Sequence, residues 1–407
     1  MKAPSTQNAR FAALDVMRGF AALFVACLHI RETAWTGEST FWHGHPHAWW
    51  SVDGLLALLS VPIMYGSFGV SAFFVISGYC IHRAHAARLA RDGQYRVDAR
   101  RFWFRRFVRI YPVLFAALCV TWACDAASTH FVPDFYKLGD ASVTSFAMNL
   151  TALVGLLAHP FGSNGALWTL SIEIQFYAVY PVLFALRRRI GMGWMLTGAL
   201  LVMVVSACVL DRHGLTCFTS YEFSWLLGAW VAERDVGVAW KATPGRWGQV
   251  VRGWFDMAPF GVDAQRLLGA GSLLVGCVAF GFSQFVSFQL WALGVAWLLP
   301  ALFDLLPRWS GRRVFALFSK LGQISYSLYA IHLPIGVLAT CALLSGHKSE
   351  SLFPTFGFVL VAIGCAYVFH LVCERPFVRY LARHPDNAPG ASKVSATASA
   401  LHADTSQ

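Results

Sequence analysis

The stretch L-D-V-M-R-G-F-A-A-L-F-V-A-C-L-H-I, at Leu14–Ile30, carries an arginine and a histidine inside an apolar run. A helix needs about 20 apolar residues to cross the hydrocarbon core of a membrane, and this run extends from about residue 11 to residue 31. Arg18 and His29 are eleven residues apart, close to three full turns, so they share one helix face, roughly 16 Å apart along the axis. Charges are costly in lipid, so the pair indicates either a function or a structural partner for each group.

The composition of the chain fits lipid as its main solvent. Of its 407 residues, 57% are hydrophobic and 13% are charged, whereas a soluble domain carries roughly 25% charged residues. The net charge of +11 comes from arginines between apolar segments and not from one amphipathic face, which argues against nucleic-acid binding. None of the ten cysteines forms a C-x-x-C pair, so no disulfide framework is expected. The alternate histidines at His43, His45 and His47 are a weak metal-binding pattern, so no metal is expected.

The apolar runs predict an all-α fold, a polytopic membrane bundle of about ten helices. The expected crossings are 11–31, 62–82, 107–127, 166–186, 192–210, 218–233, 267–283, 285–305, 320–344 and 353–373. The run from Thr144 to His159 is short for a crossing and is interpreted as an interfacial or re-entrant helix on the outer side.

The positions of Lys and Arg predict the orientation of this bundle. With both termini in the cytoplasm, 28 of these residues fall on inner segments, and four fall on outer segments: Arg31, Lys137, Arg212 and Lys348. This asymmetry agrees with the excess of basic residues in cytoplasmic loops. The expected organisation is a cytoplasmic N-terminal segment at 1–10, a membrane domain at 11–380 and a disordered cytoplasmic tail at 381–407.

Two further places hold charges at or within apolar helices. Arg106 and Arg109 lie one turn apart at the inner mouth of the third crossing, and forked guanidinium groups suit phosphate, although basic residues here also anchor helices. Glu173, in W-T-L-S-I-E-I-Q-F-Y, lies about two turns inside the fourth crossing, where a carboxylate needs a cation, a histidine or a structural hydrogen bond. Ser325, Tyr329 and His332 share one helix face, which lines a cavity or joins helices.

With these residues in view, the chain resembles acyltransferase family 3, the membrane-bound acyltransferases that modify surface and exported carbohydrates. Six pieces in the family's order carry the resemblance: Leu14–His29, F-G-V-S-A-F-F-V-I-S-G-Y at Phe68–Tyr79, R-R-F-V-R-I-Y-P at Arg105–Pro112, W-T-L-S-I-E-I-Q-F-Y at Trp168–Tyr177, I-S-Y-S-L-Y-A-I-H-L-P at Ile324–Pro334 and E-R-P-F at Glu374–Phe377. The family's Arg-x10-His, R-x-x-R and S-x-E patterns fall on Arg18 and His29, on Arg106 and Arg109, and on Ser171 and Glu173.

The resemblance implies transfer of an acyl group, most often acetyl, from cytoplasmic acyl-CoA to a hydroxyl of an exported or lipid-linked carbohydrate, in the bacterial inner membrane. Acyl-CoA is then a co-substrate, and no cofactor is permanently bound. His29 is expected as general base and Glu173 as the group that orients its imidazole. The donor phosphates are expected at Arg18, Arg105, Arg106 and Arg109, and the pocket candidates are Trp168, Ser171, Ser325, Tyr326, Tyr329 and His332.

Other interpretations of the same residues stay open. An acyl-histidine intermediate is a variant of this mechanism. Intramembrane His, Arg and Glu also build proton relays, so a proton-coupled transporter or flippase of a polysaccharide precursor is the main alternative function. A third is a non-catalytic subunit of a polysaccharide assembly complex.

Overall fold

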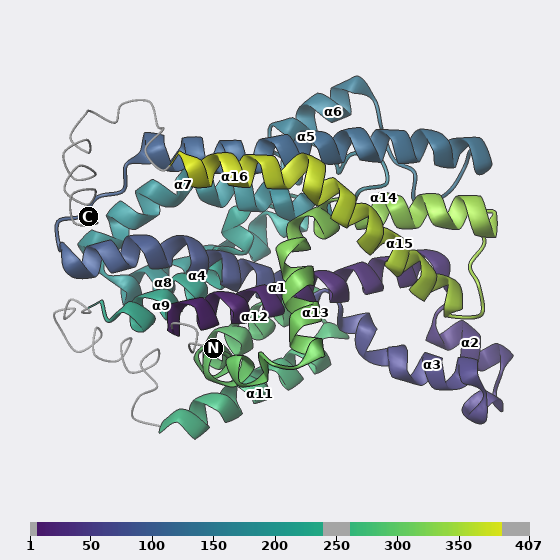
Figure 1. The fold of residues 1–407 in the computed structure, drawn as a ribbon, viewed down its shortest axis with the longest axis horizontal. Coiled ribbons are helices and arrows are strands. Elements are labelled where there is room, and N and C mark those ends of the chain that lie inside the picture. Colours follow the sequence, from purple (N-terminus) through teal and green to yellow (C-terminus); the bar gives the residue numbers. More distant parts are fainter. Residues whose placement is uncertain (1–5, 239–260, 385–407) are drawn as a thin grey trace, which may run out of the picture.

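A computed structural model of the chain describes residues 6–238 and 261–384, and within them the fold is a helical bundle without a named strand (Figure 1). Most helices lie along the long axis of the molecule, and α1 begins at the same end of the bundle at which α16 ends. The helices are α1 (Thr6–Ala34), α2 (Glu38–Gly44), α3 (Val52–Ser60), α4 (Phe68–Arg91), α5 (Ala99–Phe131), α6 (Val143–Leu150), α7 (Leu167–Ile190), α8 (Met192–Val209), α9 (Glu222–Val236), α11 (Gly261–Phe280), α12 (Gln284–Leu305), α13 (Arg313–Gln323), α14 (Ser325–Leu344), α15 (Phe353–Phe369) and α16 (Arg375–Arg383).

The all-α, multi-pass character predicted from the sequence is confirmed. A helix lies at each of the ten expected crossings. Within the described residues, seven helices are long and apolar enough to cross a membrane, or eight if a bent pair counts as one span. The bent pair joins the segment Val52–Tyr65 to α4 at an angle of 41°. One expected crossing, α9, has only 15 residues, which is short for the hydrocarbon core.

Two segments differ from the expectation, and a third is largely outside the described residues. The crossing predicted at 320–344 is broken at Ile324, so that α13 runs across the bundle and α14 alone follows its long axis (Figure 1). In the run from Thr144 to His159, only Val143–Leu150 is α-helical. The tail expected to be disordered lies, from residue 385 onward, outside the described residues.

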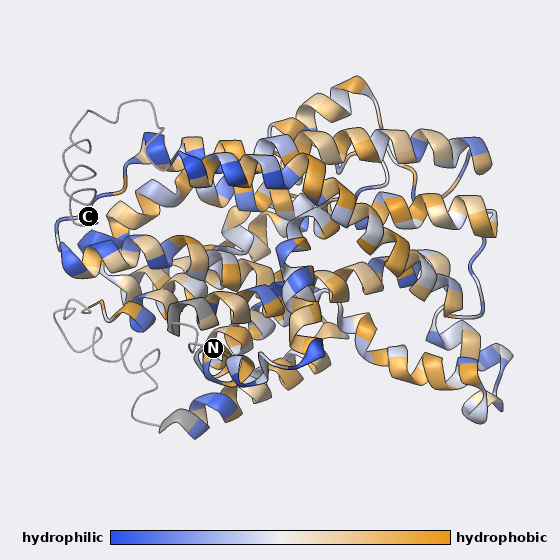
Figure 2. Cartoon of the chain, in the orientation of Figure 1, coloured by the Kyte–Doolittle hydropathy of each residue, from blue (hydrophilic) through white to orange (hydrophobic). Residues whose placement is uncertain are grey.

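The outer surface of the bundle is apolar where lipid is expected. On α8, the exposed side chains include Leu201, Val204 and Val205, and on α15 they include Leu360 and Val361. Figure 2 shows hydrophobic residues over most of the length of the helices, with hydrophilic residues concentrated in the half that holds α13 and α16 and fewer at the opposite end. Such a belt is unfavourable in water and favourable in a bilayer.

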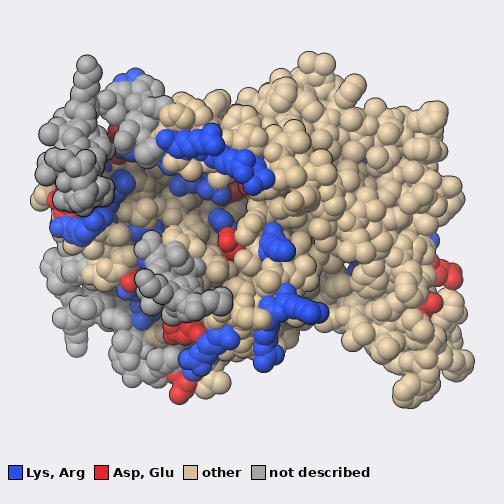
Figure 3. All heavy atoms as spheres, in the orientation of Figure 1, with Lys and Arg blue, Asp and Glu red and all other residues tan. Residues whose placement is uncertain are grey.

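Basic residues are distributed unevenly along the bundle. On the face seen in Figure 3, Lys and Arg gather over one half of the molecule, around α16 and α13, and are sparse at the end that carries α2 and α3. This matches the asymmetry on which the predicted orientation depends. Which end faces the cytoplasm stays a prediction.

Glycines allow two helix pairs to approach closely. A Cβ on Gly78 of α4 would lie 1.9 Å from the carbonyl oxygen of Trp225 on α9, and a Cβ on Gly228 of α9 would lie 1.9 Å from the oxygen of Val75. In the same way, a Cβ on Gly322 of α13 would lie 1.8 Å from the oxygen of Asp15 on α1. Small residues at such contacts let helix backbones pack in lipid, where no hydrophobic effect drives association.

A buried carboxylate fastens α4, α7 and α9 together. Glu233 of α9 is fully buried and accepts from His82 Nε2 of α4 at 2.9 Å and from Arg187 Nη2 of α7 at 2.6 Å. The next carboxylate, Asp235, accepts from Tyr79 and Arg83 of α4 and pairs with Arg10 of α1. These contacts fix the helices that enclose the functional site described below.

Gly228→Ala should destabilise the protein, because the added Cβ cannot coexist with the oxygen of Val75 and must push α9 away from α4. We expect a lower melting temperature and a lower yield of monodisperse protein in detergent size-exclusion chromatography. Gly198→Ala is the matched control, since a Cβ at that position of α8 meets nothing within 4 Å. Equal melting temperatures for the two variants would contradict the close packing of α4 and α9.

Candidate functional site

A cavity of about 560 Å³ lies among α1, α4, α5, α7, α13, α14 and the α15–α16 junction. Three of the four arginines predicted to bind a donor line it, namely Arg18, Arg106 and Arg109, whereas Arg105 is not part of its wall. Carboxylates share the same wall: Asp15, Glu173 and Glu374. The cavity therefore places several guanidinium groups beside carboxylates, which offset part of the cost of burying positive charge.

The walls of the cavity hold Arg106 and Glu173 in defined positions. The guanidinium of Arg106 lies over the rings of Phe102 and Tyr177, at 5.4 and 5.3 Å from their centroids. Glu173 accepts from Ser77 Oγ at 3.1 Å and from the hydroxyl of Tyr177. Its carboxylate also lies within electrostatic range of Arg18 and Arg106. Glu173 thus acts here as the countercharge of the cavity arginines.

His29 lies outside this cavity and pairs with a second histidine. Its Nδ1 is 2.8 Å from Nε2 of His332, which is fully buried. Nδ1 of His332 faces only carbonyl oxygens, at 3.1 Å from Leu328 and 2.9 Å from Tyr329. Since a carbonyl only accepts, this Nδ1 carries the proton, and the Nε2 of a neutral His332 is an acceptor. His29 therefore donates from Nδ1 and keeps its own lone pair on Nε2, as a general base requires.

This geometry corrects the expected role of Glu173. The sequence predicted that Glu173 orients the imidazole of His29, but the side chain that hydrogen-bonds to this imidazole is His332. Glu173 lies one turn along α7 from Thr169, whose hydroxyl hydrogen-bonds with that of Tyr329 at 2.7 Å. The carboxylate is therefore on the cavity side of that contact, with Ser77 and Tyr177.

A polar and aromatic barrier separates the cavity from the histidine pair. Phe73, Thr169 and Tyr329 line the cavity, whereas His29 and His332 do not. The ring of Tyr329 packs against Phe73 at 5.6 Å and against His332 at 5.8 Å between centroids. In this conformation, Tyr329 therefore lies between the cavity and His332.

A proline in α14 helps to hold this barrier. Pro334 has no N–H, so the carbonyl oxygen of Ala330, four residues earlier, lacks its usual helical donor. Asn164 supplies that donor from Nδ2 at 2.9 Å, and the same nitrogen reaches Thr121 Oγ1 at 2.9 Å. The segment that leads into α7 is thereby fastened to α5 and α14 beside the barrier.

The remaining pocket candidates divide between the two sides of α7 and α14. Ser325 and Tyr326 line the cavity, and the buried hydroxyl of Tyr326 has no hydrogen-bond partner among the described residues. Ser171 and Trp168 are not in its wall. Ser171 accepts from Gln175 at 3.3 Å and Trp168 packs on Tyr221. Residues two apart on a helix point to nearly opposite sides, which separates Ser171 from Glu173.

The sequence interpretation missed the junction of α15 and α16. Residues His370–Glu374 form a π-helical turn, a feature frequent at functional sites. Glu374 Oε2 accepts from Ser327 Oγ at 2.7 Å and pairs with Nδ1 of His370 at 2.9 Å, and both His370 and Glu374 line the cavity. The motif E-R-P-F marked this place, but no local pattern foretold that it would close on α14.

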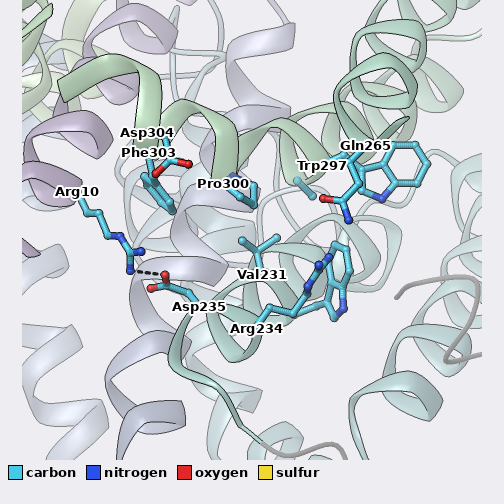
Figure 4. A pocket seen from close by; sticks show the side chains of 11 residues that line it. Arg10, Val231, Arg234, Asp235, Gln265, Trp297, Pro300, Phe303 and Asp304 are labelled. Carbon is cyan, nitrogen blue, oxygen red and sulfur yellow. Dashed lines mark hydrogen bonds and ion pairs between the residues drawn. The ribbon is translucent and has the colours of Figure 1, made fainter. Parts of the chain in front are cut away.

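A second, smaller cavity of about 240 Å³ lies beside α9 and α12 (Figure 4). Three of its charged groups are already engaged: Asp235 pairs with Arg10, and the guanidinium of Arg234 lies over the ring of Trp230 at 5.1 Å. None of the predicted site residues lines it. The larger cavity is therefore the better candidate for a functional site.

Comparisons with known proteins identify the family of the chain. A family model described as an acyltransferase domain matches residues 11–371. The peptidoglycan O-acetyltransferase OatA of Listeria monocytogenes is 28% identical over 173 residues, which cover 38% of this chain and 26% of that protein. The acyltransferase MdmB of Streptomyces mycarofaciens is 24% identical over 405 residues, which cover 92% of this chain and 93% of that protein.

A nodulation protein of Rhizobium leguminosarum, protein 10, is 28% identical over 207 residues, covering 47% of this chain and 49% of its own length. The chain thus spans about a quarter of the peptidoglycan O-acetyltransferases that it matches, at 26% and 28% of their lengths. No solved structure matches it significantly.

The hydrogen-bond pattern predicts one tautomer for His29. In protein labelled with ¹⁵N-histidine, we expect His29 at neutral pH to carry its proton on Nδ1, with Nε2 unprotonated. His332→Phe removes the acceptor and should shift the ¹⁵N signals of His29, whereas His43→Phe, which changes an exposed histidine on α2, should not. A His29 protonated on Nε2 in the unchanged protein would refute the assignment.

Proposed function

This chain belongs to acyltransferase family 3, and from that premise we propose that it transfers an acyl group, most simply acetyl, from acyl-CoA to a hydroxyl of a carbohydrate. We further propose that it acts in the bacterial inner membrane, with the arginine-rich end in the cytoplasm. The observation that carries the proposal is a cavity with three arginines that reaches Tyr329, whose ring packs on a histidine pair in which Nε2 of His29 keeps its lone pair.

The cavity suits the donor chemically. Acyl-CoA combines anionic phosphates with a narrow arm that ends in the thioester. Arg18, Arg106 and Arg109 can hold phosphates through forked, charge-assisted hydrogen bonds. The arm would extend past Tyr326 towards Thr169 and Tyr329, which also line the cavity. Peptidoglycan O-acetyltransferases among the relatives support acetyl as the group transferred.

The chemical step uses the histidine pair. His29 Nε2 takes the proton of the acceptor hydroxyl while that oxygen attacks the thioester carbonyl carbon. The tetrahedral intermediate expels the CoA thiolate, which receives the proton from His29, so the products are an ester and the free thiol. His332 accepts from His29 Nδ1 throughout and stabilises the imidazolium that forms. Glu173 contributes by keeping the arginines of the cavity in place.

The barrier at Tyr329 has to open for this step. The thioester reaches His29 once the hydroxyls of Thr169 and Tyr329 separate and the ring of Tyr329 turns away from His332. While the barrier is closed, water on the side of His29 is kept from a donor in the cavity. Closing an active site against water is a common way to suppress hydrolysis of a reactive group.

Purified protein in nanodiscs should consume labelled acetyl-CoA and place the label on a carbohydrate acceptor. His29→Ala should lower this transfer by at least about a hundredfold, the usual contribution of a general base. Arg106→Ala should chiefly raise KM for acetyl-CoA, by about tenfold or more, because charge-assisted hydrogen bonds to phosphate are lost.

His43→Ala is the control for His29, since it changes an exposed histidine of α2 that bonds to the carbonyl oxygen of Ser39 in the same helix. Equal melting temperatures of all variants would exclude misfolding as the cause. Wild-type rates of transfer in a folded His29→Ala protein would sink the proposed mechanism, and movement of carbohydrate across the membrane without ester formation would favour a transporter.

The barrier gives a separate prediction for Tyr329→Phe. Loss of the hydroxyl removes the contact with Thr169, so the donor should be less protected from water. We expect acetyl-CoA hydrolysis without acceptor to rise severalfold relative to acyl transfer. Thr169→Val removes the other partner of the same hydrogen bond and should reproduce the effect. If both variants keep the wild-type ratio of hydrolysis to transfer, the hydroxyl contact is not part of the barrier.

A further inference from the structure

Two lysines distant in sequence converge on one tyrosine ring beyond His29. The ammonium of Lys137 lies 5.6 Å from the centroid of the Tyr136 ring, and the ammonium of Lys348 lies 5.8 Å from it. The ring is well exposed, with 59% of its surface accessible. Lys137 follows α5, and Lys348 lies in the loop between α14 and α15, so the cluster is made by the fold and not by a local repeat.

The cluster lies next to His29. The hydroxyl of Tyr136 donates to the carbonyl oxygen of Glu32, at a long 3.4 Å, and Glu32 is one turn beyond His29 on α1. Lys137 is within electrostatic range of the His29 ring. Burial and the charge of Glu32 raise the pKa of Tyr136, so its hydroxyl keeps its proton at neutral pH and remains a donor.

This position is unusual for basic residues. The outer segments of the predicted topology contain only four Lys and Arg residues, Arg31, Lys137, Arg212 and Lys348, as is usual for the outer loops of membrane proteins. Two of the four meet at one ring, and the third, Arg31, is buried, pairs with Glu38 and lies over the ring of Trp35. An outer surface that is otherwise poor in positive charge is therefore positive near His29.

The two ammonium groups are available to a ligand. Within residues 6–238 and 261–384, neither lysine forms an ion pair within 4.0 Å, and the nearby carboxylate of Glu32 interacts with both only at longer range. Contact with an aromatic face positions an ammonium while leaving its hydrogen-bond donors unused, at a gain of roughly 0.5–1 kcal/mol for an exposed pair. The two lysines thus outnumber Glu32, the carboxylate that interacts with both of them.

The loops that carry the cluster are fixed to each other. The backbone of Ser349 makes two hydrogen bonds to the end of α1 and the residues after it. Its N–H donates to the carbonyl oxygen of Ala34 at 2.8 Å, and its carbonyl oxygen accepts from the N–H of Thr36 at 3.0 Å. Gly346 adopts a φ of 75° and lies against Val132 and Phe135, which precede Tyr136. A site built on such loops holds its donors in place before a ligand arrives, which favours binding.

We propose that Lys137 and Lys348, held on the ring of Tyr136 beside His29, bind an anionic group of the carbohydrate acceptor. The inference rests on the proposed function and adds to it the chemical class of the acceptor, a glycan that carries a carboxylate or a phosphate. With its anion on the lysines, the acceptor presents a neighbouring hydroxyl to Nε2 of His29. The donor and the acceptor then approach the histidine from opposite sides of the Tyr329 barrier.

Binding of a defined acidic glycan tests this directly and needs no catalysis. The probe is a hexuronic acid tetrasaccharide, compared with its carboxyl-reduced, neutral form, on protein in zwitterionic phosphatidylcholine nanodiscs at low salt. We expect the acidic form to bind about tenfold more tightly, on the order of threefold for each exposed ammonium, and the preference to shrink as salt is raised. The double variant Lys137→Gln/Lys348→Gln should bind both forms alike.

Three variants make the result specific. Arg212→Gln removes the remaining exposed basic residue of the outer segments and should keep the preference. Tyr136→Phe keeps the ring that positions the ammonium groups and should retain most of it, whereas Tyr136→Leu should lose it. Equal binding of the two forms to the unchanged protein, no binding of the acidic form, or a preference that survives in the double variant would each overturn the proposal.

A lipid headgroup shares the anionic chemistry, and a second arm separates it. If nanodiscs with phosphatidylglycerol abolish binding of the acidic tetrasaccharide, the lysines serve lipid and the proposal is overturned. Acetyl-CoA consumption, measured on the same samples, reports on the proposed function independently. Lysine-dependent glycan binding without any acetyl-CoA consumption would sink the acyl transfer and leave the anion site standing.

Discussion

A charged side chain inside a membrane bundle persists only where partners offset the cost of removing it from water, and this constraint organises the protein. Glu233 binds His82 and Arg187, and Asp235 binds residues of α1 and α4. Removing one partner of a buried pair costs about 3–5 kcal/mol, because the other charge stays buried alone. These pairs therefore determine which helices pack together, and they place α1, α4 and α7 around the cavity.

The same constraint explains the division of labour between Glu173 and His332. A carboxylate beside Arg18 and Arg106 neutralises charge that the cavity would otherwise not tolerate. His29 needs a different partner, one that fixes its tautomer without adding a full charge. Neutral His332 provides this, because two backbone carbonyls set its own proton on Nδ1. Glu173 and His332 are both held by their surroundings. The histidine pair alone leaves an unprotonated nitrogen, Nε2 of His29, that can take a proton.

Much of the fold could be predicted from the sequence, because a crossing is a local property of some 20 apolar residues. Each expected segment holds a helix, but the break at Ile324 and the π turn at His370–Glu374 depend on contacts between distant segments, such as Ser327 with Glu374. Periodicity likewise placed Ser325, Tyr329 and His332 on one face, but it could not tell which helix that face meets. The sequence therefore predicted His332 as a pocket residue, but it predicted Glu173, and not His332, as the group that orients His29.

The separation of the cavity from His29 has a consequence for how a hydroxyl can compete with water. If donor and acceptor shared one open cavity, water would reach the thioester as easily as the sugar, at far higher concentration. Here the arginines lie on one side of Phe73, Thr169 and Tyr329, and the free nitrogen of His29 and the two lysines lie on the other. An acceptor anchored beside His29 is already aligned when the barrier opens, so its hydroxyl has the advantage of proximity over any single water molecule. Selectivity for transfer over hydrolysis then follows from the order of events, with the acceptor bound before the thioester is exposed.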